Sequence, residues 1–395
     1  MKKLLIISNS VLNTDPRIIN QYLAFKDYTS IDTLGIGSIN KTIQSHEISK
    51  IFRTLTFHYE WPIIIRKPIS FFLIVFKTIT SLPKKINYSN KNHYKYWRYI
   101  NKAALRQIKT KNYDLIWAND IEVLPIAVFL KSENTKLVFD AHEYFPIEQS
   151  GEKWLKRNKE FREYLFESNV QYIDSMVTVS DSISELFFSN FGIRPTVIMN
   201  AKPYTEKEID NSHKDNIHIV HHGVALPNRN LEGLIYLFQL LDSRFILHFY
   251  LKESIFDTLN QLKKLAQNNK RILFHEPVKT SDIPLEISNY DIGIYILKNV
   301  GVNEENALPN KLFECIQARL MLIYPDLHEI KTIIEKYNIG FTTDAKDLSS
   351  LAARINKFSY SEIIKFKTNT HRAASDLCAE KEWEKMRIIA SNLLT

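Results

Sequence analysis

Residues 307–314, which read Ala-Leu-Pro-Asn-Lys-Leu-Phe-Glu, have the residue types and the spacing of an anion-binding helix start. Pro309 suits a first helical turn, Asn310 can cap it, and Lys311 adds a positive charge. The free N–H groups of such a turn favour phosphate. Glu314 follows one turn later, where its carboxylate can accept hydrogen bonds from a ribose diol. An ordinary capped helix has the same residues, so the rest of the chain must decide between the two interpretations.

The length and composition predict a soluble protein of two domains. A chain of 395 residues exceeds the size of one typical core. A content of 45% hydrophobic and 24% charged residues is usual for globular proteins. Two cysteines, Cys315 and Cys378, are too few for a disulfide framework or a zinc site, which predicts a reducing, cytoplasmic location. Residues 1–8 are basic and then apolar, but too short for a signal peptide, so they predict a first buried strand.

The charge is uneven along the chain. The net charge is +8, and residues 1–100 hold fifteen Lys and Arg against five Asp and Glu. This excess predicts an anionic partner, and no helix-turn-helix, zinc-finger or RNP-like signature supports nucleic acid. Residues 59–85 are apolar with flanking lysines, and their uncharged run 68–76 is too short to span a membrane. Two interpretations stay open for 59–85: a peripheral contact with the inner face of the membrane, or a buried helix.

Strands and helices alternate in two series, which predicts parallel sheets covered by helices on both faces. The first series has strands predicted at 4–8, 31–35, 115–118, 137–141, 176–180 and 196–199, with helices at 17–26, 96–109, 121–130, 161–174 and 183–191. The second has strands predicted at 217–221, 245–250, 271–274, 292–296, 321–324 and 340–343. A polar stretch, 200–215, lies between the series and predicts a linker. A helix is expected at 375–394.

Motifs spread along nearly the whole chain resemble those of the GT-B glycosyltransferases, specifically the retaining family 4 group. In chain order they are Asn13-Thr14-Asp15-Pro16-Arg17-Ile18, the runs YDLIWAND at 113–120 and FDAHE at 139–143, VSDSI at 179–183, VIMN at 197–200, HHG at 221–223 with Arg229, DIGI at 291–294, and PNKLFE at 309–314. The resemblance implies an α/β fold of the GT-B type. In it two doubly wound Rossmann-like domains face each other across a cleft, with ligands at the carboxyl ends of the strands.

The resemblance also implies a division of the chain. Residues 1–200 would form the acceptor-side domain, completed by a C-terminal helix, 376–395, that crosses back to it. Residues 201–215 would be the linker, and 216–375 the domain that binds the nucleotide-sugar.

On the donor side, the resemblance assigns Glu314 to the ribose and Arg229 to the diphosphate. Val224 stands where many relatives carry a second arginine, and Lys311 can compensate for it. Asn306 stands where the first glutamate of the family motif contacts the sugar, and Arg319 replaces a glycine. The other donor-binding residues implied are Gly223, Val278, Pro309 and Asn310.

On the first domain, His142 and Glu143 match the position that faces sugar and acceptor, and they are the implied catalytic residues. Four residues at strand ends and in the first loop are expected on the acceptor side: Asp15, Arg17, Asn119 and Asp120. Asp15 has a second interpretation as the cap of a helix that starts at Pro16.

The implied activity is a retaining glycosyltransferase of the hexosyltransferase type. It would move a sugar from a nucleoside diphosphate sugar to a glycan or lipid-linked acceptor in surface polysaccharide synthesis. No D-x-D motif is present, which favours metal-independent catalysis without a cofactor. The chain has neither a P-loop nor a G-x-G-x-x-G motif. Two alternatives remain: a catalytically silent sugar-nucleotide-binding subunit, suggested by Asn306, Val224 and Arg319, and a sugar-nucleotide 2-epimerase of the same fold.

Overall fold

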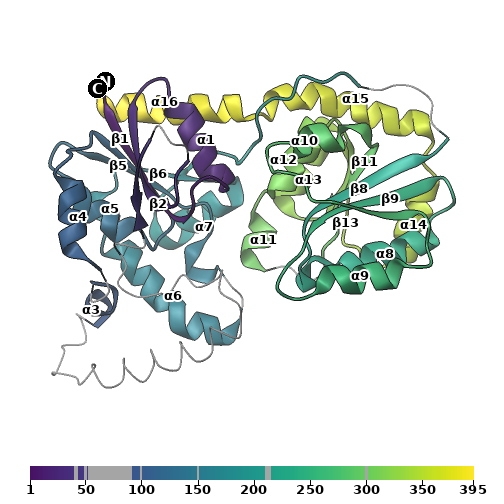
Figure 1. Ribbon diagram of the computed structural model, residues 1–395, viewed down its shortest axis with the longest axis horizontal. Coiled ribbons are helices and arrows are strands. Elements are labelled where there is room, and N and C mark those ends of the chain that lie inside the picture. Colours follow the sequence, from purple (N-terminus) through teal and green to yellow (C-terminus); the bar gives the residue numbers. More distant parts are fainter. Residues whose placement is uncertain are drawn as a thin grey trace.

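Two parallel β-sheets, each formed by its own part of the chain, organise the protein (Figure 1). The structure is a computed structural model that describes residues 1–39, 43–48, 51, 91–97, 100–148, 151–209, 215–298 and 301–395. Residues 59–85, for which a membrane contact is predicted, lie outside the described residues. No helix in the described ranges has the length and apolar character needed to cross a bilayer.

The first sheet has the strand order β3-β2-β1-β4-β5-β6-β7. Its strands are β1 (Lys3–Val11), β2 (Ser30–Ile36), β3 (Gln44–Glu47), β4 (Leu115–Asn119), β5 (Lys136–Asp140), β6 (Ser175–Thr178) and β7 (Thr196–Val197). Strand β3 was not predicted, because its Gln-Ser-His-Glu sequence has no apolar run. It pairs through its backbone at the edge of the sheet, next to β2.

The second sheet has the order β10-β9-β8-β11-β12-β13. Its strands are β8 (Ile217–Val224), β9 (Phe245–Lys252), β10 (Ile272–His275), β11 (Ile292–Ile294), β12 (Met321–Pro325) and β13 (Gly340–Thr343). All pairs in both sheets are parallel, as the alternating pattern of strands and helices predicts.

Side chains of one strand enter two different cores, because successive residues point to opposite faces. In β1, Leu5 and Ile7 belong to one buried cluster, whereas Leu4 and Ile6 belong to another. Both faces of the sheet are covered by helices, which explains why this strand reads as an unbroken apolar run.

The helices of the first domain are α1 (Pro16–Phe25), α3 (Lys91–Trp97), α4 (Lys102–Lys109), α5 (Leu124–Leu130), α6 (Glu152–Glu167) and α7 (Asp181–Phe191). The single helix predicted at 96–109 is wrong, since α3 ends at Trp97 and α4 begins at Lys102. Asn101 separates them, and its side chain accepts a hydrogen bond from the backbone N–H of Ala104 at 3.3 Å. Asparagine favours such caps over helix interiors.

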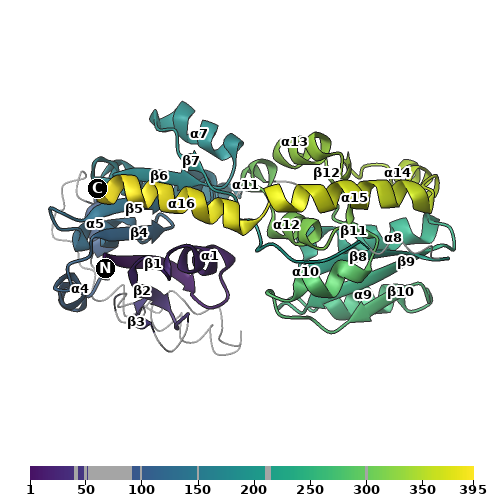
Figure 2. The same ribbon diagram turned by 90° about the horizontal axis from the view of Figure 1, so that it is seen from above.

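The helices of the second half are α8 (Leu231–Leu240), α9 (Thr258–Ala266), α10 (Ile283–Glu286), α11 (Val302–Asn306), α12 (Asn310–Gln317), α13 (His328–Tyr337), α14 (Leu348–Asn356), α15 (Tyr360–Asp376) and α16 (Ala379–Leu394). The last two run along one side of both sheets (Figures 1 and 2). A helix predicted from residue 375 in fact begins at Ala379, after a break that follows α15. At this break the Ala379 N–H donates to the carbonyl of Lys202 at 2.8 Å.

Helix α16 packs on α1 of the first domain (Figure 2). Trp383 Nε1 donates to Asn20 Oδ1 at 3.2 Å, and Arg387 Nε donates to the carbonyl of Ala24 at 2.7 Å. The C-terminal end of the chain therefore belongs structurally to its N-terminal sheet.

Arg319 ties the start of the linker to the second domain. It has a φ of +63°, a conformation that costs an arginine about 1 kcal/mol. Its side chain is 1% exposed and donates to the carbonyls of Thr205 at 2.6 Å and Gln317 at 2.7 Å. The linker prediction described a polar stretch, but its first residues are buried: Ala201 is 0% exposed and Lys202 is 6% exposed. These bonds give the arginine a structural role that the sequence did not indicate.

Candidate active site

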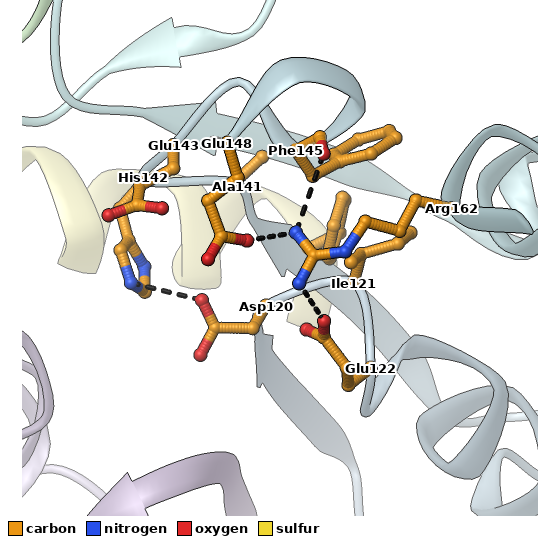
Figure 3. Close-up of a pocket in the computed structure, with 10 residues that line it drawn as sticks. Asp120, Ile121, Glu122, Ala141, His142, Glu143, Phe145, Glu148 and Arg162 are labelled. Atoms are coloured by element: carbon orange, nitrogen blue, oxygen red, sulfur yellow. Dashed lines mark hydrogen bonds and ion pairs between the residues drawn. The ribbon is translucent and has the colours of Figure 1, made fainter. Parts of the chain in front are cut away.

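The carboxyl ends of β4 and β5 bring Asp120 and His142 together. Asp120 directly follows β4 and His142 follows β5, and the His142 Nε2 atom lies 3.0 Å from Asp120 Oδ1. Asp120 has a φ of +73°, a left-handed conformation that aspartate tolerates better than most residues. The parallel order of the sheet thus joins one predicted catalytic residue and one predicted acceptor-side residue in an ion pair (Figure 3).

This ion pair lines a pocket in the first domain (Figure 3). Arg162 of α6 reaches into the same pocket, donating through Nη1 to Glu148 and through Nη2 to Glu122. The remaining lining residues are Ile121, Phe139, Ala141, Glu143 and Phe145. The sequence analysis missed Arg162, because α6 carries several basic residues and nothing in their spacing shows which one turns inward.

The pocket sets the protonation of the two predicted catalytic residues differently. Burial alone would lower the pKa of His142, but the charge and hydrogen bond of Asp120 outweigh it and raise that pKa to about 10. His142 is therefore a cation at neutral pH and acts as a hydrogen-bond donor. Although Glu143 is exposed, crowding by protein atoms and then repulsion from Glu148 raise the pKa of its carboxyl to about 7. Of the two, Glu143 is the group that can exchange a proton near neutral pH.

Arg17 lies in the core behind this pocket. It is 2% exposed and donates to Asp140 Oδ2 through Nε at 2.8 Å and to Asp140 Oδ1 through Nη2 at 3.0 Å. The Asp140 carboxylate in turn lies 4.0 Å from His142 Nδ1. Such a paired, hydrogen-bonded ion pair fixes Asp140 in place. The geometry of Arg17 suits a positioning role toward His142, and its contact with an acceptor stays a prediction.

Asn119 and Asp15 also have partners inside the domain. Asn119 is 0% exposed, and its Oδ1 accepts a hydrogen bond from Gln21 Nε2 at 2.6 Å. Asp15 caps α1 by accepting from the backbone N–H of Arg17 at 2.8 Å, in agreement with its second interpretation. Of the four residues predicted on the acceptor side, Asp120 is the one that lines the pocket.

In the second domain, Glu314 is buried between His222 and Lys202. Glu314 Oε2 accepts from His222 Nε2 at 2.7 Å, and Glu314 Oε1 lies 3.0 Å from Lys202 Nζ. Burial would raise the pKa of this carboxyl, but the two partners lower it to about 2. The sequence analysis did not place His222 or Lys202 in the site. His222 lies in the HHG motif and could have been found there, whereas Lys202 comes from the linker and gave no signal.

Arg229 and Lys311 meet at the ring of Tyr295. Arg229 Nη1 donates to the Tyr295 hydroxyl at 2.8 Å, and Lys311 Nζ lies 4.1 Å from the centre of the ring. Burial and then repulsion from Arg229 lower the pKa of Lys311 to about 8. No carboxylate in the described part of the chain forms an ion pair with either cation, because Glu314 pairs with Lys202 and His222. Two cations that meet at one ring and form no ion pair suit an anion such as a diphosphate.

Gly223 stands beside this cation pair at the end of β8. Its φ is +135°, and a Cβ atom built on it would lie 3.3 Å from Lys311 Nζ. Glycine is therefore favoured for its backbone conformation, and a Cβ atom would also require the lysine ammonium to shift by a few tenths of an ångström. This finding places the predicted donor residue Gly223 next to Lys311.

The start of α12 differs from the prediction. The helix begins at Asn310, so Pro309 stands at the N-cap position and not in the first turn, and no side chain caps the helix. Asn310 Oδ1 instead accepts from Asn200 Nδ2 at 2.6 Å, which links the helix to the end of the first domain. The prediction that Asn310 caps the helix is therefore wrong.

The remaining donor-side residues are Asn306 and Val278. Asn306 Nδ2 donates to the carbonyl of Val302 at 2.7 Å, inside its own short helix α11. Val278 is half-buried against the core cluster that includes Leu312. In the same helix as Asn306, Asn303 Oδ1 accepts from the backbone N–H of Tyr144 at 2.8 Å, a contact that the sequence did not indicate. Among the residues that the structure describes, no group of His, Cys, Asp or Glu side chains is arranged to hold a metal ion.

Solved structures of similar architecture span the whole chain. A sucrose-phosphate synthase from Thermosynechococcus elongatus aligns with a TM-score of 0.67 at 11% identity, over 100% of this chain and 99% of its own. A variant of TarM from S. aureus, in complex with fondaparinux, α-GlcNAc-glycerol and UDP, aligns with a TM-score of 0.69 at 12% identity, over 100% of both chains. HepE from Anabaena, in complex with UDP and glucose, aligns with a TM-score of 0.68 at 13% identity, over 99% of this chain and 100% of its own.

No protein-family model matches the sequence, and no curated protein sequence matches it. The structural likeness and the two sheets together show the fold. The chain has the GT-B fold, and its described residues form seven strands in the first sheet and six in the second.

Proposed function

We propose that the protein is a glycosyltransferase that moves a sugar from a nucleoside diphosphate sugar to a glycan or lipid-linked acceptor, with retention at the anomeric carbon and without a metal. The observation that carries the proposal is the cation pair of Arg229 and Lys311, which forms no ion pair among the described residues, although the charge of the ionised Glu314 acts on Lys311. Three of the donor-site residues implied by the sequence resemblance thus occupy one part of the second domain.

The second domain would bind the nucleotide and stabilise the leaving group. The departing nucleoside diphosphate gains negative charge in the transition state, and fixed cations aimed at that charge are a large source of catalysis. Arg229 and Lys311 would supply these cations. Glu314, held as a carboxylate by Lys202 and His222, would accept hydrogen bonds from the ribose. Its two present partners leave further lone pairs of the carboxylate for that purpose.

The first domain would act on the sugar and the acceptor. His142 is protonated, so it would donate a hydrogen bond and not remove a proton. Glu143 would take the proton of the acceptor hydroxyl or pass it toward the leaving phosphate, because its pKa is about 7. The carboxylates of the pocket would favour the positive charge that develops on the sugar ring, as in other glycosyl transfers.

The acceptor and the location are parts of the same proposal. TarM and HepE, of similar architecture, are described in complexes that contain UDP and a sugar, which supports a nucleotide-sugar donor and a glycan acceptor. The basic first hundred residues favour an acceptor at the cytoplasmic face of the membrane, with 59–85 as the contact.

A second candidate is a sugar-nucleotide 2-epimerase. Such an enzyme needs carboxyl groups that gain and lose protons, and the pocket offers two. Burial raises the pKa of Glu122 to about 7, and Glu143 has a similar value. Glu122 is bound to Arg162, however, so of these two carboxyl groups Glu143 is the one available for such chemistry.

A panel of UDP-, GDP- and ADP-sugars tests the proposal. Slow release of free nucleoside diphosphate supports a transferase, interconversion of the sugar nucleotide supports the epimerase, and binding without turnover supports a silent subunit. Arg229→Ala and Glu314→Ala should each weaken nucleotide binding by about tenfold to a hundredfold. Arg194→Ala is the matched control, since Arg194 is exposed and pairs with Glu185 in the first domain. Wild-type nucleotide affinity in both site variants would contradict the assigned donor site.

A further inference from the structure

Helix α11 belongs to the second half of the chain but rests on the first domain. Asn303 Oδ1 accepts from the Tyr144 N–H at 2.8 Å, and the Asn306 carbonyl accepts from Ser180 Oγ at 2.5 Å. Ala307 packs against the core cluster of the first domain. Figures 1 and 2 both show α11 close to α7 (Asp181–Phe191), in agreement with these contacts. The helix therefore bridges the two domains.

The carboxamide of Asn303 has a defined orientation and an unused donor. Only the oxygen of an amide can accept from the Tyr144 N–H, which fixes the other end as Nδ2. Asn303 is 8% exposed, and its Nδ2 is buried without a hydrogen-bond partner. Buried donors in native proteins nearly always have a partner, so an unpaired one calls for a ligand or a bound water.

The position of Asn303 lies between the two halves of the proposed site. Tyr144, which holds the amide, directly follows His142 and Glu143. On the other side, the next residue of α11, Glu304, is close enough to Tyr295 for its charge to act on that hydroxyl, and Tyr295 binds Arg229. In the proposed function, a sugar whose diphosphate lies at Arg229 and whose anomeric carbon faces Glu143 would therefore lie near α11.

We infer that Asn303 is a specificity-determining residue whose Nδ2 donates a hydrogen bond to one hydroxyl oxygen of the transferred sugar. This inference rests on the proposed function. A neutral amide donor suits a hydroxyl and does not compete with the cation pair for phosphate. Asn306, which stands at the family's sugar-contacting position, is not available in the same way, because its Nδ2 donates to Val302 at 2.7 Å. The sugar contact has thus moved one helical turn along α11.

The test uses the full chain and separates the two ends of the amide. Asn303→Ala removes the Oδ1 acceptor and the Nδ2 donor. Asn303→Asp keeps an oxygen that can accept from the Tyr144 N–H but loses the Nδ2 donor. Glu305→Gln is the matched control, because Glu305 is an exposed residue of the same helix. With the donor found in the nucleotide-sugar panel, Asn303→Ala and Asn303→Asp should lower kcat/KM about tenfold or more, while the Kd for the free nucleoside diphosphate stays within about twofold. Glu305→Gln should remain close to the wild type in both.

A series of deoxy-sugar donors identifies the hydroxyl. Wild-type enzyme should discriminate against one deoxy donor by about tenfold, and Asn303→Ala should show no further loss with that donor alone. Wild-type kcat/KM in Asn303→Asp, an equal loss with every deoxy donor, or the same defect in Glu305→Gln would overturn the inference. Failure of the wild type to bind any nucleoside diphosphate would instead refute the proposed function, so the two failures are distinguishable.

Discussion

Replacing Lys311 with Met should have opposite effects on binding and on stability. Lys311 is half-buried beside Arg229, and its pKa is about 8. Methionine keeps most of the side-chain volume against Tyr295 and removes the charge. We expect the variant to bind nucleoside diphosphate more weakly and yet to unfold at a higher temperature than the wild type.

The magnitude of the stability effect follows from the pKa. A fall from the ordinary 10.5 to about 8 corresponds to about 3 kcal/mol, at about 1.4 kcal/mol per pKa unit. Partial exposure screens the charge, so an effect of about 1–2 kcal/mol is realistic. For a domain of this size, such a gain raises the unfolding midpoint by about 2–8 °C. The lost charge-assisted bond to phosphate should weaken binding about tenfold to a hundredfold.

The stability gain expected for Lys311→Met should depend on pH. The unfolded chain binds the Lys311 proton more tightly than the folded protein does, so the folded state carries the full penalty below about pH 8. The penalty is relieved as the pH rises from about 8 to the ordinary value of 10.5. The stability difference between Lys311→Met and the wild type should therefore shrink over that range. Nucleotide binding at pH 8 should also take up about half a proton in the wild type and none in the variant.

Differential scanning calorimetry and titration calorimetry measure both effects. Lys263→Met on α9 is the control, because Lys263 is an exposed lysine of the same domain, and it should change neither midpoint nor affinity. An unchanged nucleotide Kd in Lys311→Met would refute the assignment of Lys311 to the diphosphate. A lower unfolding midpoint in Lys311→Met would refute the inference that burying the charge of Lys311 destabilises the folded protein.

Three other outcomes are expected. The rate of sugar transfer by the wild type should fall as the pH drops through about 7, because Glu143 takes up a proton. Glu143→Gln should transfer slowly, at a rate that does not change over that pH range. A pH–rate profile measures both, and a variant whose rate still falls with acid as the wild type's does would exclude Glu143 as the base. Arg319→Gly relieves the strain of a φ of +63° but loses the buried hydrogen bonds to Thr205 and Gln317. Denaturant unfolding should therefore show a free energy of unfolding lower by about 1–3 kcal/mol. A higher free energy of unfolding would contradict the structural role of Arg319 at the linker. Burial and then the neighbouring His218 and His275 lower the pKa of His248 to about 3. The stability that depends on neutral His248 should therefore be fully present above pH 6.5 and decline toward pH 3. His248→Gln should make this decline shallower in an acid unfolding curve, and an unchanged curve would show that other groups cause it.

The fold could be predicted from the sequence where strands are buried on both faces. Strand β4 reads as Leu-Ile-Trp-Ala-Asn, and its first four residues were predicted because they are all apolar. Strand β3 could not be predicted, since its pairing depends on the backbone of β2 and not on its own side chains. Helix α16 was predicted in its main part, but its start depends on the contact between Ala379 and Lys202, which is far away in the chain.

The candidate site was predictable where a residue follows a strand or opens a helix. Asp120, His142, Lys311 and Glu314 all lie at such positions, and the family resemblance implied the roles of His142 and Glu314. The ion pair of Asp120 with His142 depends on the neighbouring places of β4 and β5 in the sheet. Arg162, Lys202 and Asn303 were missed for a common reason. Each reaches the site from an element whose local pattern describes only its own helix or linker.

The contact between Lys202 and Glu314 limits where this chain can be divided. A chimaera that exchanges the two halves between proteins of the GT-B fold needs a junction. The polar stretch after residue 200 is an obvious position for it. A fragment that begins at residue 216 would lack Lys202, whose ammonium lies 3.0 Å from Glu314, and would leave a buried carboxylate with one partner fewer. A junction placed before Ala201 would keep that lysine with the second half, so that the buried Glu314 carboxylate would retain both of its partners in the chimaera.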